Sequence, residues 1–149
     1  MILPDDITLR PAAPQDSEFA FNVKKSAFRK YIEMVWGWND AEQRAMHERR
    51  FAEHEFWIVS MDEIDIGILA LVRTSDRIDV NQLFLLSDYQ RQGIGCYCMQ
   101  RILAESKKKD MPVYIQTLKV NIPAQNFAEK LGFRKVGETA THIQWEWSE

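Results

Sequence analysis

Two glycines, Gly93 and Gly95, lie where an apolar run gives way to an apolar-periodic segment, in the stretch LLSDYQRQGIGCYCMQ (residues 85–100). A strand followed by a glycine-bearing loop and a helix leaves free backbone N–H groups and the positive end of a helix dipole at the junction, which favours phosphate. The stretch lacks both the Gly-Lys-Ser/Thr ending of one common phosphate loop and the third glycine of the dinucleotide-binding loop. The glycines alone therefore leave a phosphate site and a plain tight turn as equal alternatives.

The apolar periodicity predicts the elements that must position this loop. Apolar residues at four-residue spacing from Phe19 to Tyr31 indicate a helix with Asp16 as its N-cap, and another helix is expected from Ile94 to a point before Pro112. Between residues 56 and 86 the period becomes strand-like, which predicts an antiparallel meander. The remaining expectations are strands at residues 7–10, 56–60, 65–73, 78–86, 113–118, 133–138 and 142–147, and helices at residues 40–52 and 123–131.

Composition limits the class of protein. The 149 residues suffice for one domain, expected to cover residues 1–149, and 46% hydrophobic against 28% charged residues indicates a folded, soluble chain. A net charge of -3 does not indicate the basic surface that a nucleic-acid partner requires, so a cationic small substrate agrees better with the charge of the chain. No apolar stretch is long enough to span a membrane, and the first residues lack a basic segment followed by an apolar one, so we expect a cytoplasmic protein.

The cysteines, Cys96 and Cys98, lie two residues apart in an expected helix. Residues at this spacing point to different sides of a helix, which suits neither a disulfide nor a metal pair. We expect ordinary thiols and no metal site.

Three segments resemble the GCN5-related N-acetyltransferase (GNAT) superfamily. QRQGIG, residues 90–95, resembles the family's Gln/Arg-x-x-Gly-x-Gly/Ala loop, which grips the pyrophosphate of coenzyme A. NIPAQNFAEKLGF, residues 121–133, resembles its second motif, and ITLRPAAPQDSEF, residues 7–19, resembles its usual opening. Because these segments occur in the expected order and at the expected spacing, the resemblance covers nearly the whole chain.

The resemblance implies an α/β (α+β) fold with a mixed, mostly antiparallel sheet of about seven strands and about four flanking helices. The sheet would splay between its fourth strand (residues 78–85) and its fifth (residues 113–117), and the thioester arm of acetyl-CoA, the cosubstrate, would enter there. The residues that the resemblance assigns to the cofactor are Leu83, Phe84, Leu85, Gln90, Arg91, Gln92, Gly93, Ile94, Gly95, Cys96, Asn121 and Phe127.

The resemblance also assigns catalytic roles. Backbone groups near Leu83 and Leu85 would bind the pantetheine arm and polarise the thioester carbonyl, and the side chain of Asn121 would steady the arm. A fixed donor in a dry cleft stabilises an oxyanion better than water does.

Two positions depart from the family pattern. Ala128 stands where the family usually has a tyrosine that protonates the departing thiolate, and Tyr114 is a candidate replacement, although packing is the commoner use of a strand tyrosine. Asn81 and Gln82 stand where many members have an acidic base. An amine with a pKa of about 10.4 costs about 4.6 kcal/mol to deprotonate at pH 7, so a base is expected. Its candidates, each of which also has an ordinary structural reading, are Asp79, Glu33 and His142.

The amine substrate is expected to bind near residues 31–44, which form one wall of the site across the family. The proposed contacts are Tyr31, Glu33, Trp36 and Trp38, beside Asp40 and Glu42. Aromatic faces attract ammonium groups by about 0.5–2 kcal/mol, so these residues form either a pocket for a cation or a cap on the core.

Two functions remain open. One is an N-acetyltransferase that moves the acetyl group of acetyl-CoA to a primary amine of a small molecule or peptide by direct attack in a ternary complex. The other is an acyl-CoA-binding or regulatory module without catalysis. The last expected strand, residues 142–147, places Ile143, Trp145 and Trp147 on one face, which suits packing on the chain's own helix or, as an alternative, a homodimer.

Overall fold

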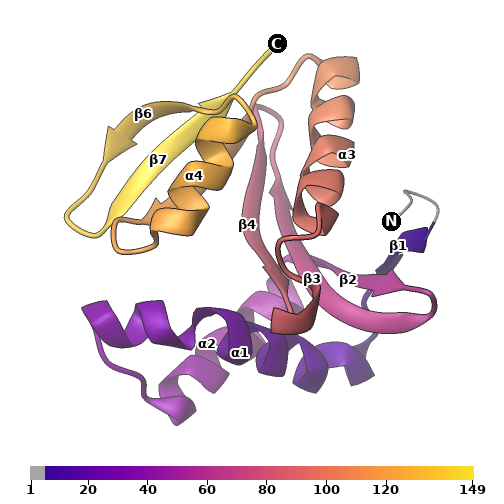
Figure 1. Cartoon of the computed structure of the whole chain (residues 1–149), viewed down its shortest axis with the longest axis vertical. Coiled ribbons are helices and arrows are strands. Elements are labelled where there is room, and N and C mark those ends of the chain that lie inside the picture. The colour runs from indigo at the N-terminus through magenta and orange to yellow at the C-terminus, as the bar shows by residue number, and fades with distance from the viewer. Residues whose placement is uncertain (1–5) are drawn as a thin grey trace.

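The computed structural model describes residues 6–149, so the expectation about a leader segment falls in part on residues 1–5, outside the described residues. A seven-stranded sheet has the order β1-β2-β3-β4-β5-β7-β6 (Figure 1). The strands are β1 (Ile7–Pro11), β2 (Glu55–Met61), β3 (Ile64–Arg73), β4 (Ile78–Leu85), β5 (Val113–Leu118), β6 (Arg134–Glu138) and β7 (His142–Trp147). The α-helices are α1 (Ser17–Val35), α2 (Asp40–Glu53), α3 (Ile94–Lys109) and α4 (Ile122–Lys130).

These elements confirm the predicted ones, and most of their ends differ by only one or two residues. The strands β2, β3 and β4 form the expected antiparallel meander. Asp16 is the N-cap of α1, but its carboxylate makes no cap bond to that helix. It accepts instead from Ala13 N at 2.7 Å and from the Arg10 guanidinium at 2.8 Å, so it ties β1 to the start of α1.

The sheet opens between β4 and β5. These neighbours run parallel because α3 connects them as a crossover, and they pair only at Ile78 with Val113 and at Asp79 with Tyr114. Beyond these pairs β4 stays bonded to β3 while β5 stays bonded to β7. The sheet therefore splays at the predicted place, and Figure 1 shows β4 and β7 diverging toward α1.

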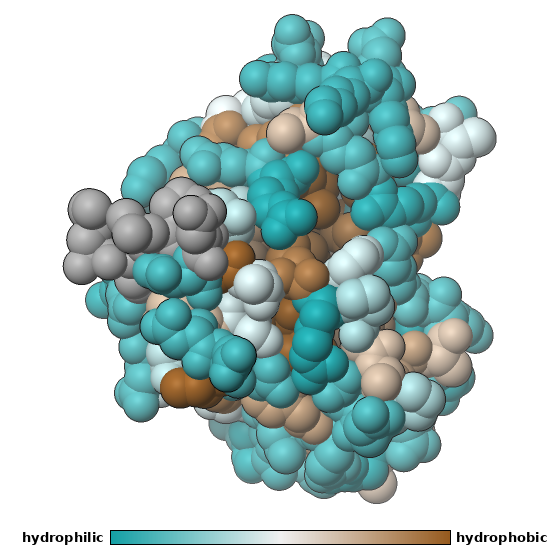
Figure 2. Space-filling model, turned by 90° about the vertical axis from the view of Figure 1, so that its right-hand side faces the viewer, coloured by the Kyte–Doolittle hydropathy of each residue, from teal (hydrophilic) through white to brown (hydrophobic). Residues whose placement is uncertain are grey.

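Helices cover both faces of the sheet. Ala20 and Val23 of α1 pack on Ile58 and Ile68, whereas Cys98 of α3 packs on Val59 from the other face. Most of this apolar surface is hidden: the face shown in Figure 2 is largely hydrophilic, with a central hydrophobic band and smaller hydrophobic patches. The splayed strands thus lie between two helical layers.

A β-bulge re-aims the side chains of β4. Leu71 pairs with Val80 and Ala70 pairs with Gln82, which leaves Asn81 as an extra residue. Val80 packs in the core under α3, and without a bulge Gln82 would point to the same face. The extra residue turns Gln82 toward α1 and α2.

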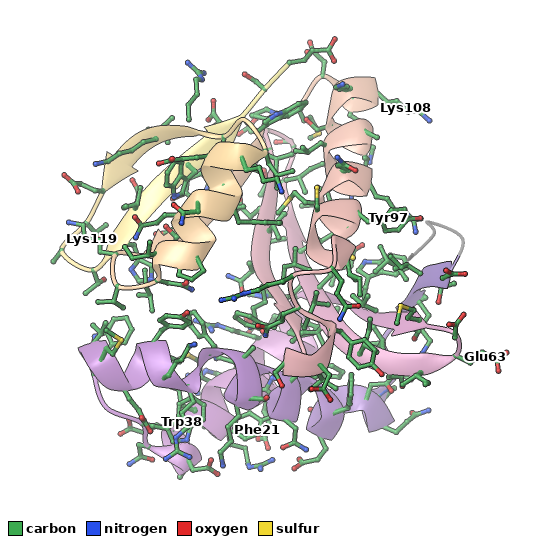
Figure 3. The ribbon with its side chains drawn as sticks, viewed as in Figure 1. Phe21, Trp38, Glu63, Tyr97, Lys108 and Lys119 are labelled. Carbon is green, nitrogen blue, oxygen red and sulfur yellow. The ribbon has the colours of Figure 1, made fainter. Side chains whose placement is uncertain are left out.

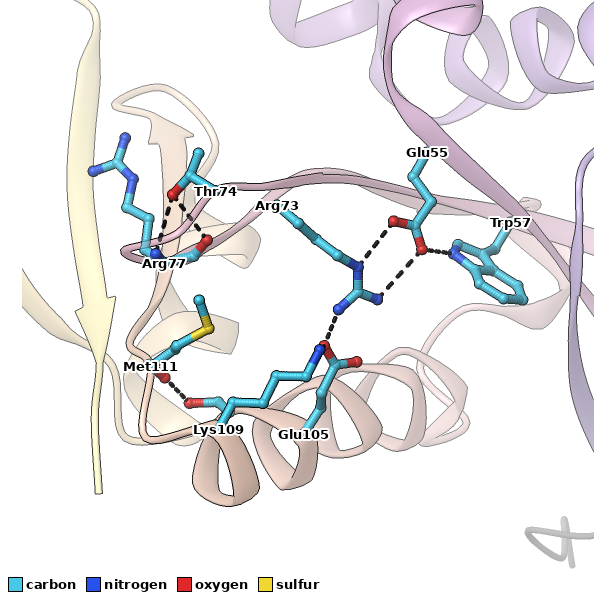
Figure 4. A network of polar contacts seen from close by, with 9 residues as sticks. Glu55, Trp57, Arg73, Thr74, Arg77, Glu105, Lys109 and Met111 are labelled. Atoms are coloured by element: carbon cyan, nitrogen blue, oxygen red, sulfur yellow. Dashed lines mark hydrogen bonds and ion pairs between the residues drawn. The ribbon is translucent and has the colours of Figure 1, made fainter.

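A charged network holds β2 and β3 to α3 (Figure 4). Arg73 Nε lies 2.8 Å from a carboxylate oxygen of Glu55, and Arg73 Nη1 pairs with Glu105 of α3. Trp57 Nε1 also donates to Glu55 at 2.8 Å. Burial raises the pKa of Glu55, but the bonds from Arg73 and Trp57 outweigh that effect and hold it below its ordinary value.

The last strand of the chain is not the last strand of the sheet. β7 lies between β5 and β6, so the free edge on that side of the sheet belongs to β6. Trp145 is buried, and Ile143 and Trp147 pack against the same core cluster, which includes Ala128 of α4. The alternative in which this face packs within the chain is therefore confirmed.

Candidate active site

A cleft of about 840 Å³ lies where the sheet opens. Side chains of β4 and β5 form one side of it, and α1, α2 and the loop between them face these strands. Asn121 and Phe127 of α4 and His142 of β7 complete the wall.

β4 presents an open backbone edge to this cleft. Its pairing with β5 stops at Asp79, while its pairing with β3 continues to Leu85. A strand bonded on one side leaves a row of N–H and C=O groups on the other. Leu83 and Phe84 line the cleft, whereas Leu85 lies outside the lining and its carbonyl accepts a hydrogen bond from Gln90 Nε2 at 2.8 Å. The backbone near Leu83 is thus available to a molecule in the cleft.

The loop before α3 carries free N–H groups. Arg91 and Gly93 have left-handed backbones, with φ of 61° and 86°, and Gly93 is the N-cap of α3 without a side-chain cap. Within residues 6–149, the backbone N–H groups of residues 91–96 donate to no protein atom, and Tyr97 N is the first to do so, to Gly93 O at 3.0 Å. Free N–H groups at a helix N-terminus suit a phosphate.

Phe127 links this loop to the cleft. A Cβ on Gly95 would lie 3.7 Å from Phe127 Cε1, and Phe127 also lines the cleft. Asn121 caps α4 by accepting from Ala124 N at 3.2 Å, so its amide nitrogen is the group left to donate into the cleft. The loop itself lies outside the cleft lining, and α4 forms the connection between the two.

His142 begins β7 and lines the cleft. Its Nδ1 lies 2.8 Å from Thr141 Oγ1, and its ring lies 6.1 Å from the ring of Trp36. Burial lowers the pKa of His142 below its ordinary value, so its imidazole is neutral at neutral pH. With Nδ1 beside Thr141, Nε2 is the nitrogen left to accept a proton.

The loop between α1 and α2 brings two tryptophans, Trp36 and Trp38, to the cleft. Trp38 lies beside Phe21 of α1 (Figure 3), with ring centroids 6.3 Å apart, and its Nε1 donates to Asp40 at 3.2 Å. Tyr31 lies outside the cleft lining, and its ring is 6.1 Å from that of Phe28. The loop therefore supplies indole surface to the cleft.

Two cations of the cleft were missed by sequence analysis. Lys24 of α1 is 2% exposed, and Arg50 of α2 lines the same wall. Burial lowers the pKa of Lys24 to about 8, with a smaller effect from Arg50, and burial also lowers the pKa of Arg50. The available signal was the four-residue spacing of Lys24 with Phe28 and Ile32, which puts a lysine on an otherwise apolar helix face.

Comparison with known families and structures agrees with this geometry. The model of the family described as Acetyltransferase (GNAT) family matches residues 20–133. The chain belongs to the GNAT acetyltransferase family. Among the curated proteins, none matches this chain in sequence.

Solved GNAT structures share the fold at low identity. A PaiA N-acetyltransferase from Thermoplasma acidophilum, in complex with coenzyme A, superposes with a TM-score of 0.79 at 15% identity, over 96% of this chain and 99% of that one. The ribosomal-protein-S18-alanine N-acetyltransferase from Escherichia coli has a TM-score of 0.73 at 15% identity, over 95% and 93%. Arabidopsis thaliana Naa50, in complex with the bisubstrate analogue CoA-Ac-MVNAL, has a TM-score of 0.73 at 17% identity, over 97% and 99%.

Several predicted site residues of this GNAT chain lie outside the cleft lining. Glu33 pairs with Arg29 at 2.6 Å on the exposed side of α1. Tyr114 and Asp79 face each other where β4 and β5 still pair, and both contact Arg77: its guanidinium lies 3.9 Å from the Tyr114 ring and 2.7 Å from the Asp79 carboxylate. His142 is thus the one of the three base candidates that reaches the cleft.

Ala128, which the resemblance places where the family usually has a tyrosine, lies in the hydrophobic core. Ala128 is 0% exposed and packs in the cluster that contains Val113 and Phe133. It does not line the cleft, so this GNAT chain offers no side-chain acid there.

Both cysteines are free thiols. Cys96 is partly exposed and Cys98 is buried, and burial raises the pKa of the Cys98 thiol to about 11. Among residues 6–149, no three His, Cys, Asp or Glu side chains gather closely enough to hold a metal ion. In the same part of the chain, no helix has the length and apolar character needed to cross a membrane.

Proposed function

We propose that this protein transfers the acetyl group of acetyl-CoA to the primary amine of a small molecule or a peptide, by direct attack of the amine in a ternary complex. The observation that carries the proposal is the row of free N–H groups at residues 91–96, at the N-terminus of α3 and beside strands that part. Two structural neighbours, the PaiA enzyme and Naa50, are complexes with coenzyme A or a coenzyme A conjugate, which supports the same use of the cleft here.

The loop is proposed to bind the diphosphate. Its N–H groups and the dipole of α3 favour an anion, and Gly95 leaves room beside Phe127. The amide nitrogen of Asn121 and the open edge of β4 would bond the amides of the pantetheine arm. Acetyl-CoA supplies the activated acetyl group.

The chain's contribution to the transfer is electrostatic and geometric. As the amine attacks, negative charge develops on the thioester oxygen, and we infer that a backbone N–H near Leu83, which lines the cleft, stabilises it. His142 is proposed to take a proton from the ammonium group of the substrate, which leaves the neutral amine to attack, because His142 lines the cleft and stays neutral. A thiol with a pKa of about 8.5 leaves readily enough near neutral pH that Ala128 does not forbid turnover.

A second candidate is an acyl-CoA-binding module without catalysis. The buried Ala128 and the amides of Asn81 and Gln82, in place of acid and base, favour it. It would use the same loop and cleft, so binding alone does not separate the two.

The test combines calorimetry with acetyl-CoA and a CoA-release assay over amino acids, polyamines and peptides. Binding together with release above the rate of uncatalysed hydrolysis supports the transferase. Binding without release for every amine supports the module instead. Absence of acetyl-CoA binding would remove both candidates.

A further inference from the structure

The wall of the cleft formed by α1 and α2 holds two basic side chains, Lys24 and Arg50, that pair with no acid in the described part of the chain. Within residues 6–149, the side chains of Lys24 and Arg50 make no ion pair and no hydrogen bond, although other basic residues of the same helices, such as Lys25 and Arg44, pair with acids at 2.8 and 2.7 Å. Buried charges are normally paired, because an isolated one is costly to desolvate. The two cations are therefore poised for a charge that the protein does not itself supply.

Helix geometry puts both cations into the same cleft. Lys24 shares its face of α1 with Phe28 and Ile32, and Arg50 shares its face of α2 with Met46, and all of these line the cleft. Burial is the main cause of the low pKa of Lys24, and the second cause is the positive charge of Arg50, so the two side chains lie close enough to repel. A single bound anion would relieve both effects.

Unsatisfied amides lie on both sides of the same cleft. Gln82 is 4% exposed and lines the cleft, and neither its Oε1 nor its Nε2 has a hydrogen-bond partner. Gln43 Oε1, on the α2 side of the cleft, is also buried without a partner. Because a buried polar atom left unbonded costs about 1–3 kcal/mol, amides of this kind usually have a partner. A ligand with polar atoms would supply it.

This site differs from the phosphate loop. The bulge at Asn81 turns Gln82 to the face of the sheet that α1 and α2 cover, whereas residues 91–96 begin α3, which packs on the other face. The diphosphate of coenzyme A at the loop would leave Lys24 and Arg50 without a partner. The anion that they bind should then belong to the other substrate.

The acids expected to attract a cation are neutralised. Glu33 pairs with Arg29 at 2.6 Å, and Asp40 pairs with Lys25 at 2.8 Å. Of the acids beside the tryptophans, Glu42 alone lines the cleft. The part of the cleft near Lys24 and Arg50 is thus positive, and the part near Trp36 and Trp38 is aromatic. This arrangement does not favour a substrate whose only charge is an ammonium group.

We propose that the amine substrate of this acetyltransferase carries a compact anionic group, a carboxylate or a phosphate monoester, that binds between Lys24 and Arg50. The inference rests on the proposed function, because it places the amine of the same molecule toward β4. Arg50 offers a planar fork and Lys24 a point charge, and both groups recognise carboxylate and phosphate oxygens. Gln82 Nε2, on the β4 side of the cleft, is a further donor.

The test uses matched pairs of amines. L-amino acids and dipeptides are compared with their C-terminal amides, and aminoalkyl phosphates with the corresponding amino alcohols, by CoA release. Loss of a charge-assisted hydrogen bond costs about 1.5–3 kcal/mol, so we expect kcat/KM to be about 10- to 100-fold higher for the anionic member of the best pair. Comparison of the carboxylate pairs with the phosphate pairs identifies which anionic group the site prefers.

Variants locate the effect. Lys24→Met and Arg50→Gln should raise KM for the anionic amine about 10- to 100-fold, so that the ratio of kcat/KM between the two members of the best pair falls toward one. Lys30→Met and Arg49→Gln are matched controls, because each substitution removes a positive charge from the same helix at an exposed position outside the cleft lining. The controls should behave as wild type toward both members of each pair.

A binding assay keeps the inference separate from catalysis. CoA-loaded protein is titrated with N-acetylated amino acids, their amides and alkyl phosphates in a thermal-shift assay, and the anions should stabilise wild type but not Lys24→Met. Turnover without preference for the anionic member overturns the inference and leaves the proposed function intact. Anion binding without turnover of any amine would support the anion site and would count against the proposed acetyl transfer. Equal binding of anions by wild type and Lys24→Met, or acetylation of Lys24 itself detected by mass spectrometry, also overturns the inference.

Discussion

Two charged regions of the molecule differ in how their charges are balanced. On the side of α3, Arg73 is held between Glu55 and Glu105, and Lys109 pairs with Glu105 at 3.0 Å (Figure 4). In the cleft, Lys24 and Arg50 have no such partner among the described residues. These basic residues of the α3 region have acidic partners within the chain, and those of the cleft do not.

The difference separates groups that stabilise the fold from groups that we propose bind a ligand. Satisfied ion pairs add modestly to stability, whereas an unpaired buried cation lowers it. The free N–H groups of residues 91–96 and the unbonded amide of Gln82 belong to the second class. Substitutions in the cleft should therefore change binding more than stability, or change the two in opposite directions.

The largest effect is expected at the loop. Gly95→Glu places a carboxylate among the free N–H groups and beside Phe127, where it occupies the anion site. Loss of two or more charge-assisted bonds together with repulsion should weaken acetyl-CoA binding by about 1000-fold. Calorimetry measures the affinity.

The fold should tolerate Gly95→Glu, because an acid in the first turn of a helix complements its dipole. Ala104→Glu is the matched control on the exposed side of α3 and should bind acetyl-CoA as wild type does. A Gly95→Glu protein with undiminished affinity would remove the phosphate assignment of the loop.

The next effect concerns proton transfer. His142→Asn removes the proposed base, and kcat should fall about 100-fold. A base must be neutral to accept a proton, and burial lowers the pKa of His142 from 6.5, so wild-type activity should hold at neutral pH and fall only as the pH drops below that lowered value. The kcat profile between pH 5 and 8 measures this limb, which the variant should lack.

His54→Asn is the control for that profile. His54 follows α2 and lies outside the cleft lining, so its replacement should keep both the rate and the acid limb. An acid limb that persists in His142→Asn would assign the proton to another group.

The sequence was sufficient for features set by local chemistry. The ranges of β5 and β7, the helix after Gly93 and the place where the sheet splays were predicted from periodicity and from the family motifs. Local spacing and glycine positions determine the two strands and the helix, because neighbouring residues fix them, whereas the place of the splay was implied by the resemblance to the family.

Features that depend on distant partners could not be predicted. The bulge at Asn81 is a mismatch between β3 and β4, and it alone turns Gln82 to the α1 and α2 face. The pairing of Asp40 with Lys25, and the lack of a partner for Lys24, depend on how α2 docks on α1. The pair of Arg29 with Glu33, by contrast, is local to α1. Sequence analysis identified the acids beside the tryptophans but did not predict that Glu33 and Asp40 pair with basic residues of the chain.

The third effect is a gain of stability. Lys24→Met removes an unpaired buried cation and keeps the volume of the side chain, so the free energy of unfolding should rise by roughly 2 kcal/mol below pH 8. The pKa of Lys24 is about 8 in the fold against 10.5 ordinarily, so between these values the folded wild type holds fewer protons than the unfolded chain. Wild-type stability should therefore rise with pH across this window and approach that of the variant, as urea unfolding at pH 7 and pH 10 can measure.

The smallest effect is expected in the satisfied region, where Arg73→Met breaks the contacts to Glu55 and Glu105. Because these side chains are partly exposed, we expect a loss of about 1 kcal/mol in the free energy of unfolding, with no change in acetyl-CoA affinity. Arg134→Met, at an exposed position of β6, should change neither quantity. Urea unfolding of Arg73→Met and Lys24→Met side by side should give shifts of opposite sign. Shifts of the same sign would show that pairing within the chain does not distinguish the two regions.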